Sequence, residues 1–243
     1  MSKKGNIKVI DLFAGPGGLG EGFAAFSNGS GKHPFKLSLS IEKDPSAHNT
    51  LLLRSFFRQF GSDYIPDNYW YYLNGGITRE DLFRLHPKQA AAAFAEAKCI
   101  ELGKMPRDDV KGLIDQRLNG TSKWVLVGGP PCQAYSLVGR ARMRRTQPDF
   151  EKDERHFLYR EYLRIITDHK PPVFVMENVQ GMLSAQHSGK NLIQKILSDL
   201  QHPDVTRRGL SSDFEYRLFS LVEKKLHGSY EPKDFLVHAE KYG

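Results

Sequence analysis

The feature that most constrains the fold is a β-rich run near the start of the chain that breaks into a glycine turn. Residues 7–13 read Ile-Lys-Val-Ile-Asp-Leu-Phe, and residues 14–20 read Ala-Gly-Pro-Gly-Gly-Leu-Gly. Helical spacing resumes over residues 21–26. A strand, a glycine turn and a helix in this order open a nucleotide-binding α/β unit.

The same alternation of strand and helix continues along the chain, and it predicts the fold class. We expect further strands at 35–41, 124–128, 173–176 and 216–222, and helices at 45–60, 81–103, 110–118, 157–167, 191–200 and 232–242. Long loops are expected at 61–76, which is rich in tyrosine, and at 139–155. The prediction is one α/β domain over residues 1–243, a Rossmann-like, mostly parallel sheet with helices on both faces.

The composition indicates which kind of partner the chain binds and in which compartment it works. The chain has 35 Lys and Arg against 28 Asp and Glu, a net charge of +7 and a pI near 9.3, which favours a polyanionic partner. Two cysteines in 243 residues do not make a disulfide framework. The start lacks the apolar region of a secretory signal, and no stretch is long enough to span a membrane, so we expect a cytoplasmic protein.

The glycine turn and the end of the second predicted strand together suggest an adenosine-type ligand. Glycine lets the backbone approach a ligand closely. Glu42 lies at the distance downstream where a carboxylate accepts hydrogen bonds from both ribose hydroxyls. The turn lacks the spacing of the dinucleotide fingerprint, which disfavours a nicotinamide cofactor. The alternative is a chance glycine turn and a surface glutamate.

Two further motifs carry reactive side chains at predicted strand ends. Residues 128–133 read Gly-Gly-Pro-Pro-Cys-Gln, so Cys132 follows two prolines whose φ angles are fixed. Such a cysteine is either a nucleophile with a lowered pKa or an inert, buried thiol. Glu177 follows the predicted strand 173–176 among apolar residues, where a carboxyl can hold a proton at neutral pH. For Glu177 in isolation, the favoured interpretation is a solvent-exposed cap or loop residue.

Three motifs, in order and spacing, resemble the DNA (cytosine-5)-methyltransferase family. They are Asp-Leu-Phe-Ala-Gly-Pro-Gly-Gly at 11–18, Gly-Pro-Pro-Cys-Gln at 129–133 with Ser136 and Gly139 following, and Glu-Asn-Val at 177–179. The stretch 153–164 is also similar to the segment between the family's cysteine and glutamate motifs, so the match runs from about Lys8 to the last residue. The resemblance implies a Rossmann-like class I methyltransferase with catalytic Cys132, Glu177 and Asn178.

The resemblance also implies the cofactor and its site. S-adenosylmethionine would lie over the glycine turn and leave as S-adenosylhomocysteine, and no metal is expected. Where the family carries an acidic residue for the adenine amine, this chain has Gly76-Ile77-Thr78 without one. The residues implied to bind the cofactor are Phe13, Gly15, Gly17, Gly18, Leu19, Glu42, Lys43, Ile77, Pro130 and Leu158.

Double-stranded DNA is the implied substrate, and its target cytosine must leave the duplex to reach Cys132. The residues implied to contact DNA follow the cysteine on a loop that resembles the family's mobile catalytic loop: Gln133, Ser136, Arg140, Arg142, Arg144 and Arg145. Arginines of this kind contact phosphates, unless the loop is merely solvated.

The family normally continues beyond the equivalent of Gly243 with an arginine-containing strand, a target-recognition region and a last helix, none of which lies within these 243 residues. We therefore expect a truncated form, an interrupted gene product or one half of a split enzyme, weakly active or inactive alone and needing a C-terminal partner. The leading hypothesis is a bacterial restriction-modification methyltransferase. A transfer-RNA cytosine-5 methyltransferase and a catalytically silent DNA-binding subunit remain as alternatives.

Overall fold

The computed structural model describes residues 6–61, 64–131, 155–184, 186–187, 190–204, 214–225 and 230–242. It divides into two compact units: the first is Met1–Gly129 with Pro171–Met176, and the second is Pro130–Lys170 with Glu177–Gly243. Each unit is described by itself, and the single domain over residues 1–243 stays a prediction.

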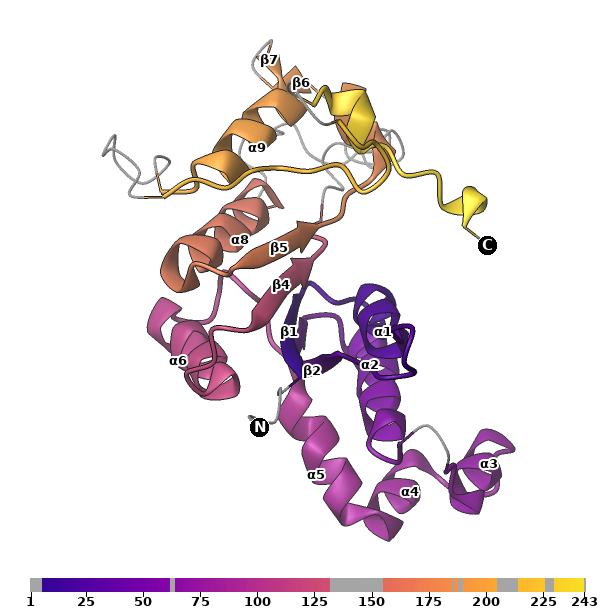
Figure 1. The fold of residues 1–243 in the computed structure, drawn as a ribbon. Helices are drawn as coiled ribbons and strands as arrows, with labels where there is room; N and C mark the ends of the chain where they lie inside the picture. The colour runs from indigo at the N-terminus through magenta and orange to yellow at the C-terminus, as the bar shows by residue number, and fades with distance from the viewer. Residues whose placement is uncertain are drawn as a thin grey trace, which may run out of the picture. The chain divides into compact units, whose positions relative to one another are not determined.

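The first unit is built on a parallel sheet of five strands in the order β3-β2-β1-β4-β5 (Figure 1). The strands are β1 (Ile7–Leu12), β2 (Phe35–Glu42), β3 (Ala97–Cys99), β4 (Trp124–Gly128) and β5 (Val173–Met176). Every residue of β4 is buried, as are the last four of β1. Strands buried on both faces read as continuous apolar runs, which is why the sequence revealed them. The predicted α/β class is confirmed.

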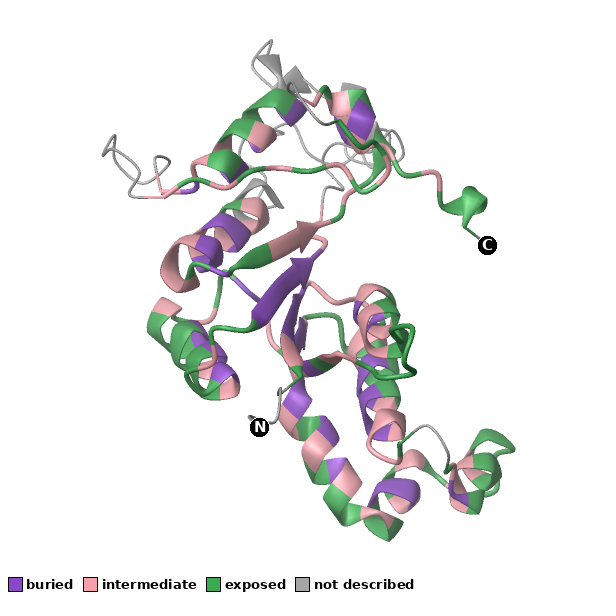
Figure 2. Ribbon diagram, in the orientation of Figure 1, coloured by how far each residue is buried: buried purple, intermediate pink, exposed green. Residues whose placement is uncertain are grey.

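Helices cover both faces of this sheet. In Figure 1, α6 (Arg107–Leu118) lies on one side, and α1 (Gly18–Ala25) and α2 (Pro45–Arg58) lie on the other. Val9, Leu37 and Val127 form a buried cluster against which Leu19 and Phe23 of α1 pack. Figure 2 shows the resulting pattern: β4 is buried, β5 is intermediate or exposed, and the helices are exposed on their outer faces. Among the described helices, none has the length and apolar character needed to cross a bilayer.

Two parts of the sequence-based assignment in this unit were wrong. The segment 81–103, expected to be one helix, contains α4 (Arg79–Leu85), α5 (Pro87–Glu96) and strand β3. Pro87 takes the first turn of α5, where its missing N–H costs nothing, so it separates the two helices. The expected loop 61–76 contains helix α3 (Asp67–Leu73). Strand β3 has only three residues, and its pairing with β2 rather than its own propensity makes it a strand.

The second unit contains α8 (Arg155–His169), α9 (Leu192–Gln201) and the short antiparallel pair β6 (Gln186–His187) and β7 (Lys190–Asn191). It also has the 3₁₀ turns η2 (Gln180–Ser184), η4 (Pro232–Phe235) and η5 (Ala239–Lys241). Helix α9 buries Leu192, Ile193, Ile196 and Leu200 on one face. The hydroxyl of Tyr159 on α8 donates to the carbonyl of Ile196 at 3.3 Å.

The strand expected at 216–222 and the helix expected at 232–242 were also wrong. The segment 214–225 has no regular secondary structure, and 232–242 holds only η4 and η5. Side-chain bonds organise this region instead: the Asp234 carboxylate accepts from the backbone N–H of Glu231 at 2.6 Å and pairs with Lys225 at 2.5 Å. A strand needs a hydrogen-bonded neighbour, which an alternating apolar pattern alone does not provide.

Candidate active site

The carboxyl ends of β1 and β4 lie side by side at the point where the strand order reverses. From β1 the chain runs outward to β2 and β3, and it then crosses back to β4 and β5. Leu12 at the end of β1 pairs with Gly128 at the end of β4. In open α/β sheets, ligands bind outside the carboxyl ends of the strands at such a reversal. The glycine turn and the Gly-Gly-Pro-Pro-Cys motif follow these two strand ends directly.

The glycine turn after β1 has a left-handed backbone at three residues. Phe13 has φ 56°, Gly15 has φ 56° and Gly17 has φ 93°. The turn is tied to the next strand, because the N–H of Ala14 donates to the carbonyl of Ile41 at 2.9 Å. A Cβ on Gly17 would lie 2.8 Å from Cδ1 of Leu51. The motif therefore needs glycine at position 17 for both its φ and its space.

Glu42, at the end of β2, is held by backbone amides on both carboxylate oxygens. Its Oε2 accepts from the N–H of Gly15 at 2.8 Å. Its Oε1 accepts from the N–H of Lys43 at 2.8 Å and of Asp44 at 2.7 Å. A carboxylate has about four acceptor positions, so about one remains, on Oε2. The structure thus joins Glu42 to the glycine turn and leaves its carboxylate acceptor capacity for one further donor, whereas the sequence predicted two ribose hydroxyls there.

The other predicted cofactor residues of the first unit follow the end of β1 or of β2 in the chain, with the exception of Ile77. Gly18 opens α1 and is exposed, and Leu19 turns its side chain into the sheet core. Lys43 is exposed directly after Glu42. Ile77, by contrast, lies just before α4 and packs against the buried cluster of α2, α4 and α5 that also contacts Ala14.

The segment after β3 brings an acidic side chain, Glu101, next to Lys43, and the sequence did not single it out. Cys99 pairs with Glu42 across the two strands, and the N–H of Ile100 donates to the carbonyl of Glu42 at 2.9 Å. Glu101 then forms ion pairs with Lys43 at 3.5 Å and with Lys104 at 3.0 Å. Both lysines contribute to lowering the pKa of Glu101, with the Lys104 hydrogen bond first. If β3 had been recognised at the end of the alanine-rich stretch, Glu101 would have been found just after a strand.

The motifs predicted to be catalytic lie only partly within the described residues. Cys132 and the predicted DNA contacts Gln133, Ser136, Arg140, Arg142, Arg144 and Arg145 lie outside the described residues. Pro130 is buried, and its carbonyl accepts from Nδ2 of Asn178 at 3.4 Å, which links the cysteine and glutamate motifs within the second unit. The Asn178 Oδ1 also accepts from the N–H of Val179 at 2.8 Å.

Glu177 is exposed, although the sequence suggested apolar surroundings. Leu158, in the same unit, lies half-buried on α8.

A buried carboxyl, Asp11, lies beneath the glycine turn. It is 1% exposed, and its oxygens make no hydrogen bond of normal geometry to the described residues, although the Gly20 N–H lies close enough to act on its charge. Its Oδ2 lies 2.7 Å from the position that a Cβ on Gly20 would take, so helix α1 can pack here only with glycine. Burial raises the pKa of Asp11 to about 7, and the Gly20 backbone N–H and the Arg58 charge oppose the increase.

Comparison with known proteins agrees with this geometry. Residues 84–204 match the C-5 cytosine-specific DNA methylase family. The chain is 34% identical over 195 residues to the type II methyltransferase M.Bpa9945I of Bacillus paralicheniformis, an alignment covering 73% of this chain and 42% of that protein. It is 29% identical to M.AquIA of Picosynechococcus, covering 81% of the chain and 57% of that protein. It is 28% identical to M.DdeI of Desulfomicrobium norvegicum, in an alignment that covers 79% of this chain and 32% of that protein.

These alignments cover only part of each relative, from 32% of M.DdeI to 57% of M.AquIA. The family match over residues 84–204 includes the Gly-Gly-Pro-Pro-Cys motif and the Glu-Asn-Val motif. Parallel strand order, site motifs and family match agree: the chain belongs to the C-5 cytosine-specific DNA methylase family.

Proposed function

We propose that the chain is the cofactor-binding and catalytic part of a DNA (cytosine-5)-methyltransferase from a bacterial restriction-modification system. The family match supports the reaction class. The relatives named above are type II methyltransferases, which supports the biological setting. The predicted DNA-binding arginines and the net charge of +7 agree with a polyanionic substrate.

The observation that carries the proposal is the position of Glu42. Its carboxylate is fixed by three backbone N–H groups beside a left-handed glycine turn, at the carboxyl edge of a parallel sheet. Strand β4 lies beside β1 at the point where the strand order reverses, and in the sequence it runs into the Gly-Gly-Pro-Pro-Cys motif. A ligand with a ribose hydroxyl as donor fits this arrangement.

The residues present fit S-adenosylmethionine. Glu42 Oε2 would accept one ribose hydroxyl, and Phe13 and Lys43 would flank the adenosine. The backbone of Gly15, Gly17 and Gly18 would approach the ligand closely, since no Cβ intervenes. Ile77 would line the adenine site, while Leu158 and Pro130 would line the methionine end. When bound, S-adenosylmethionine supplies the methyl group and leaves as S-adenosylhomocysteine.

Cys132 and Glu177 would activate the cytosine. The Cys132 thiolate adds to carbon 6 of the flipped base, forming a carbon–sulfur bond and shifting electron density to carbon 5. Glu177 donates a hydrogen bond or proton at ring nitrogen 3, where negative charge develops. After carbon 5 has been methylated, a base removes its proton, and the carbon 6–sulfur bond breaks to return the thiolate. Asn178, bonded to Pro130, would keep the glutamate and cysteine motifs in register.

The test uses duplex DNA containing 5-fluorocytosine, with S-adenosylmethionine and the chain alone or together with a candidate C-terminal polypeptide. Fluorine cannot leave as a cation, so the Cys132 adduct should accumulate and shift in a denaturing gel. The adduct should vanish in Cys132→Ser and persist in Cys99→Ser, the control at the second cysteine, which is exposed. No adduct with any partner, or an adduct that survives Cys132→Ser, would refute the mechanism. Adducts with fluorinated transfer RNA alone would identify an RNA methyltransferase.

We also propose that this chain has little activity without a further polypeptide, which is either a continuation of the chain or a separate subunit. The chain and this polypeptide together would hold the target base. Support comes from the share of the relatives that it spans, between 32% and 57% for the three compared. Adduct yield should therefore rise strongly when the partner polypeptide is added to the assay above.

A further inference from the structure

One face of helix α2 contacts the glycine turn and the start of α1 at three successive places. Leu51, Arg54 and Arg58 are three and four residues apart, so they share a helix face. Leu51 lies against Gly17. Nη1 of Arg54 donates to the carbonyl of Pro16 at 3.1 Å. Arg58 forms an ion pair with Glu21 in the first turn of α1.

The turn has little local stabilisation beyond one internal hydrogen bond, from the N–H of Gly17 to the carbonyl of Ala14 at 2.9 Å. Its left-handed residues include Phe13, and side chains with a Cβ disfavour that conformation. The N-cap of α1 is Gly17, which offers no side-chain hydrogen bond to the free N–H groups of the helix. Glu21 is the acidic residue of that first turn, placed favourably for the helix dipole. The shape of the turn therefore depends on contacts from other elements: β2 holds Ala14 and Gly15, and α2 holds Pro16 and Gly17.

Arg58 extends this support to a second helix. Its other guanidinium nitrogen donates to Glu96 at the end of α5, and the two side chains are 17% and 9% exposed. Arg58 thus joins α1, α2 and α5 through two carboxylates. Asp11 lies near enough for the Arg58 charge to lower its pKa, while Glu42 and Glu96 raise it. Arg54 is different in kind, because it is exposed and makes one bond to a neutral carbonyl.

We propose that Arg54 and Arg58 are positioning residues, which hold the glycine turn in the conformation that receives S-adenosylmethionine. This inference rests on the proposed function, because it assumes that this turn binds the cofactor. Neither arginine needs to touch the ligand: Arg54 fixes the carbonyl of Pro16 between Gly15 and Gly17, and Arg58 fixes the first turn of α1.

The experiment measures the Kd of S-adenosylmethionine by calorimetry for the full chain and for Arg54→Met, Arg54→Lys and Arg58→Met. Arg84→Met on α4 is the matched control, since its side chain is 76% exposed and contacts only Asp81 among the ion pairs described. Loss of one hydrogen bond from a charged donor predicts about fivefold to tenfold weaker binding for Arg54→Met. Its urea midpoint should stay unchanged. Arg54→Lys can still donate to Pro16 and should restore most of the affinity.

Arg58→Met should weaken binding by about tenfold or more and lower the urea midpoint, because it leaves Glu21 and Glu96 without their cation. Wild-type affinity in Arg54→Met, or an equal loss in Arg84→Met, would overturn the positioning role while leaving the proposed function intact. If the wild-type chain binds no S-adenosylmethionine, the proposed cofactor site fails and this inference fails with it.

Discussion

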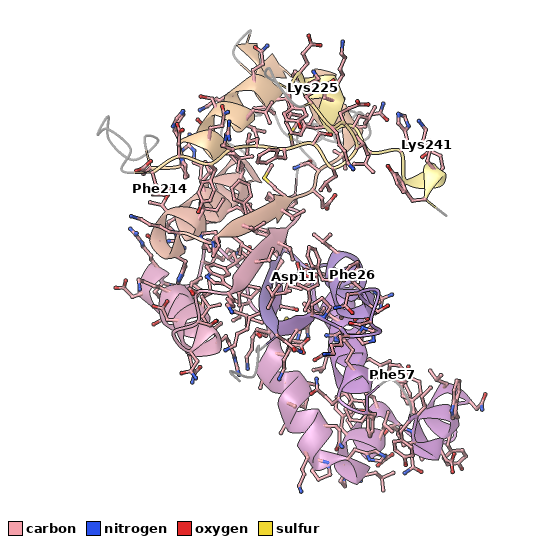
Figure 3. The ribbon with its side chains drawn as sticks, viewed as in Figure 1. Asp11, Phe26, Phe57, Phe214, Lys225 and Lys241 are labelled. Atoms are coloured by element: carbon pink, nitrogen blue, oxygen red, sulfur yellow. The ribbon has the colours of Figure 1, made fainter. Side chains whose placement is uncertain are left out.

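Replacement of the buried Asp11 by asparagine should change how the stability of the chain depends on pH. Asp11 lies on β1 beside α1 (Figure 3), and it is 1% exposed with no hydrogen bond of normal geometry to the described residues. Burial raises its pKa from 3.8 to about 7. Asparagine has the same shape as the carboxyl and carries no charge at any pH. The substitution therefore imitates the protonated residue that the fold prefers.

The sign and size follow from the two pKa values. In the unfolded chain Asp11 loses its proton near pH 4, whereas the folded chain keeps it up to about pH 7. The stability from the bound proton is complete below pH 4, declines as the pH rises and levels off above 7. The difference between 3.8 and about 7 corresponds to about 4 kcal/mol. Roughly 2 to 3 kcal/mol of this is lost between pH 5 and pH 8.

The assay is urea unfolding at pH 5, 6, 7 and 8, followed by circular dichroism and fitted by linear extrapolation. The free energy of unfolding of Asp11→Asn, relative to wild type, should rise by about 2 to 3 kcal/mol across this range. Asp81→Asn is the control. Its pKa is lowered, chiefly by the Thr78 hydroxyl, so Asp81 stays ionised throughout and any loss should be independent of pH. Parallel curves for Asp11→Asn and wild type would refute the reasoning.

Two further substitutions test the site geometry. Glu42→Ala should weaken S-adenosylmethionine binding markedly in calorimetry, because it removes the proposed ribose acceptor and the bond to Gly15. Unchanged affinity, or an equal loss in the control Glu80→Ala at an exposed residue, would contradict the ribose assignment. Gly17→Ala should destabilise the chain by about 2 kcal/mol or more in urea unfolding, through its positive φ and the contact with Leu51. The control is Gly22→Ala within helix α1, where a Cβ meets open space, and it should be neutral or stabilising. Equal effects at both positions would show that the turn tolerates a side chain.

Much of the first unit could be predicted from sequence, because its signals are local. Strands β1, β2, β4 and β5 are apolar runs, and the helices between them carry their own spacing and breaks. The glycine turn and Glu42 were expected to serve one ligand, and the structure joins them by a hydrogen bond of 2.8 Å between Gly15 and Glu42. The failures were segments whose structure depends on a distant partner, such as the three-residue β3 beside β2 and the segment 214–225.

By itself, the sequence determined the family and the chemistry available to the chain: a glycine turn, a cysteine after two prolines and a glutamate after a strand, in a fixed order. The tertiary structure decided which charges share a neighbourhood. Asp11 became a buried acid, Arg58 joined carboxylates 37 and 38 residues away, and Glu101 came to lie beside Lys43. The reason is physical: motifs and periodicity encode local backbone geometry, whereas burial and electrostatic environment arise only when remote segments pack together.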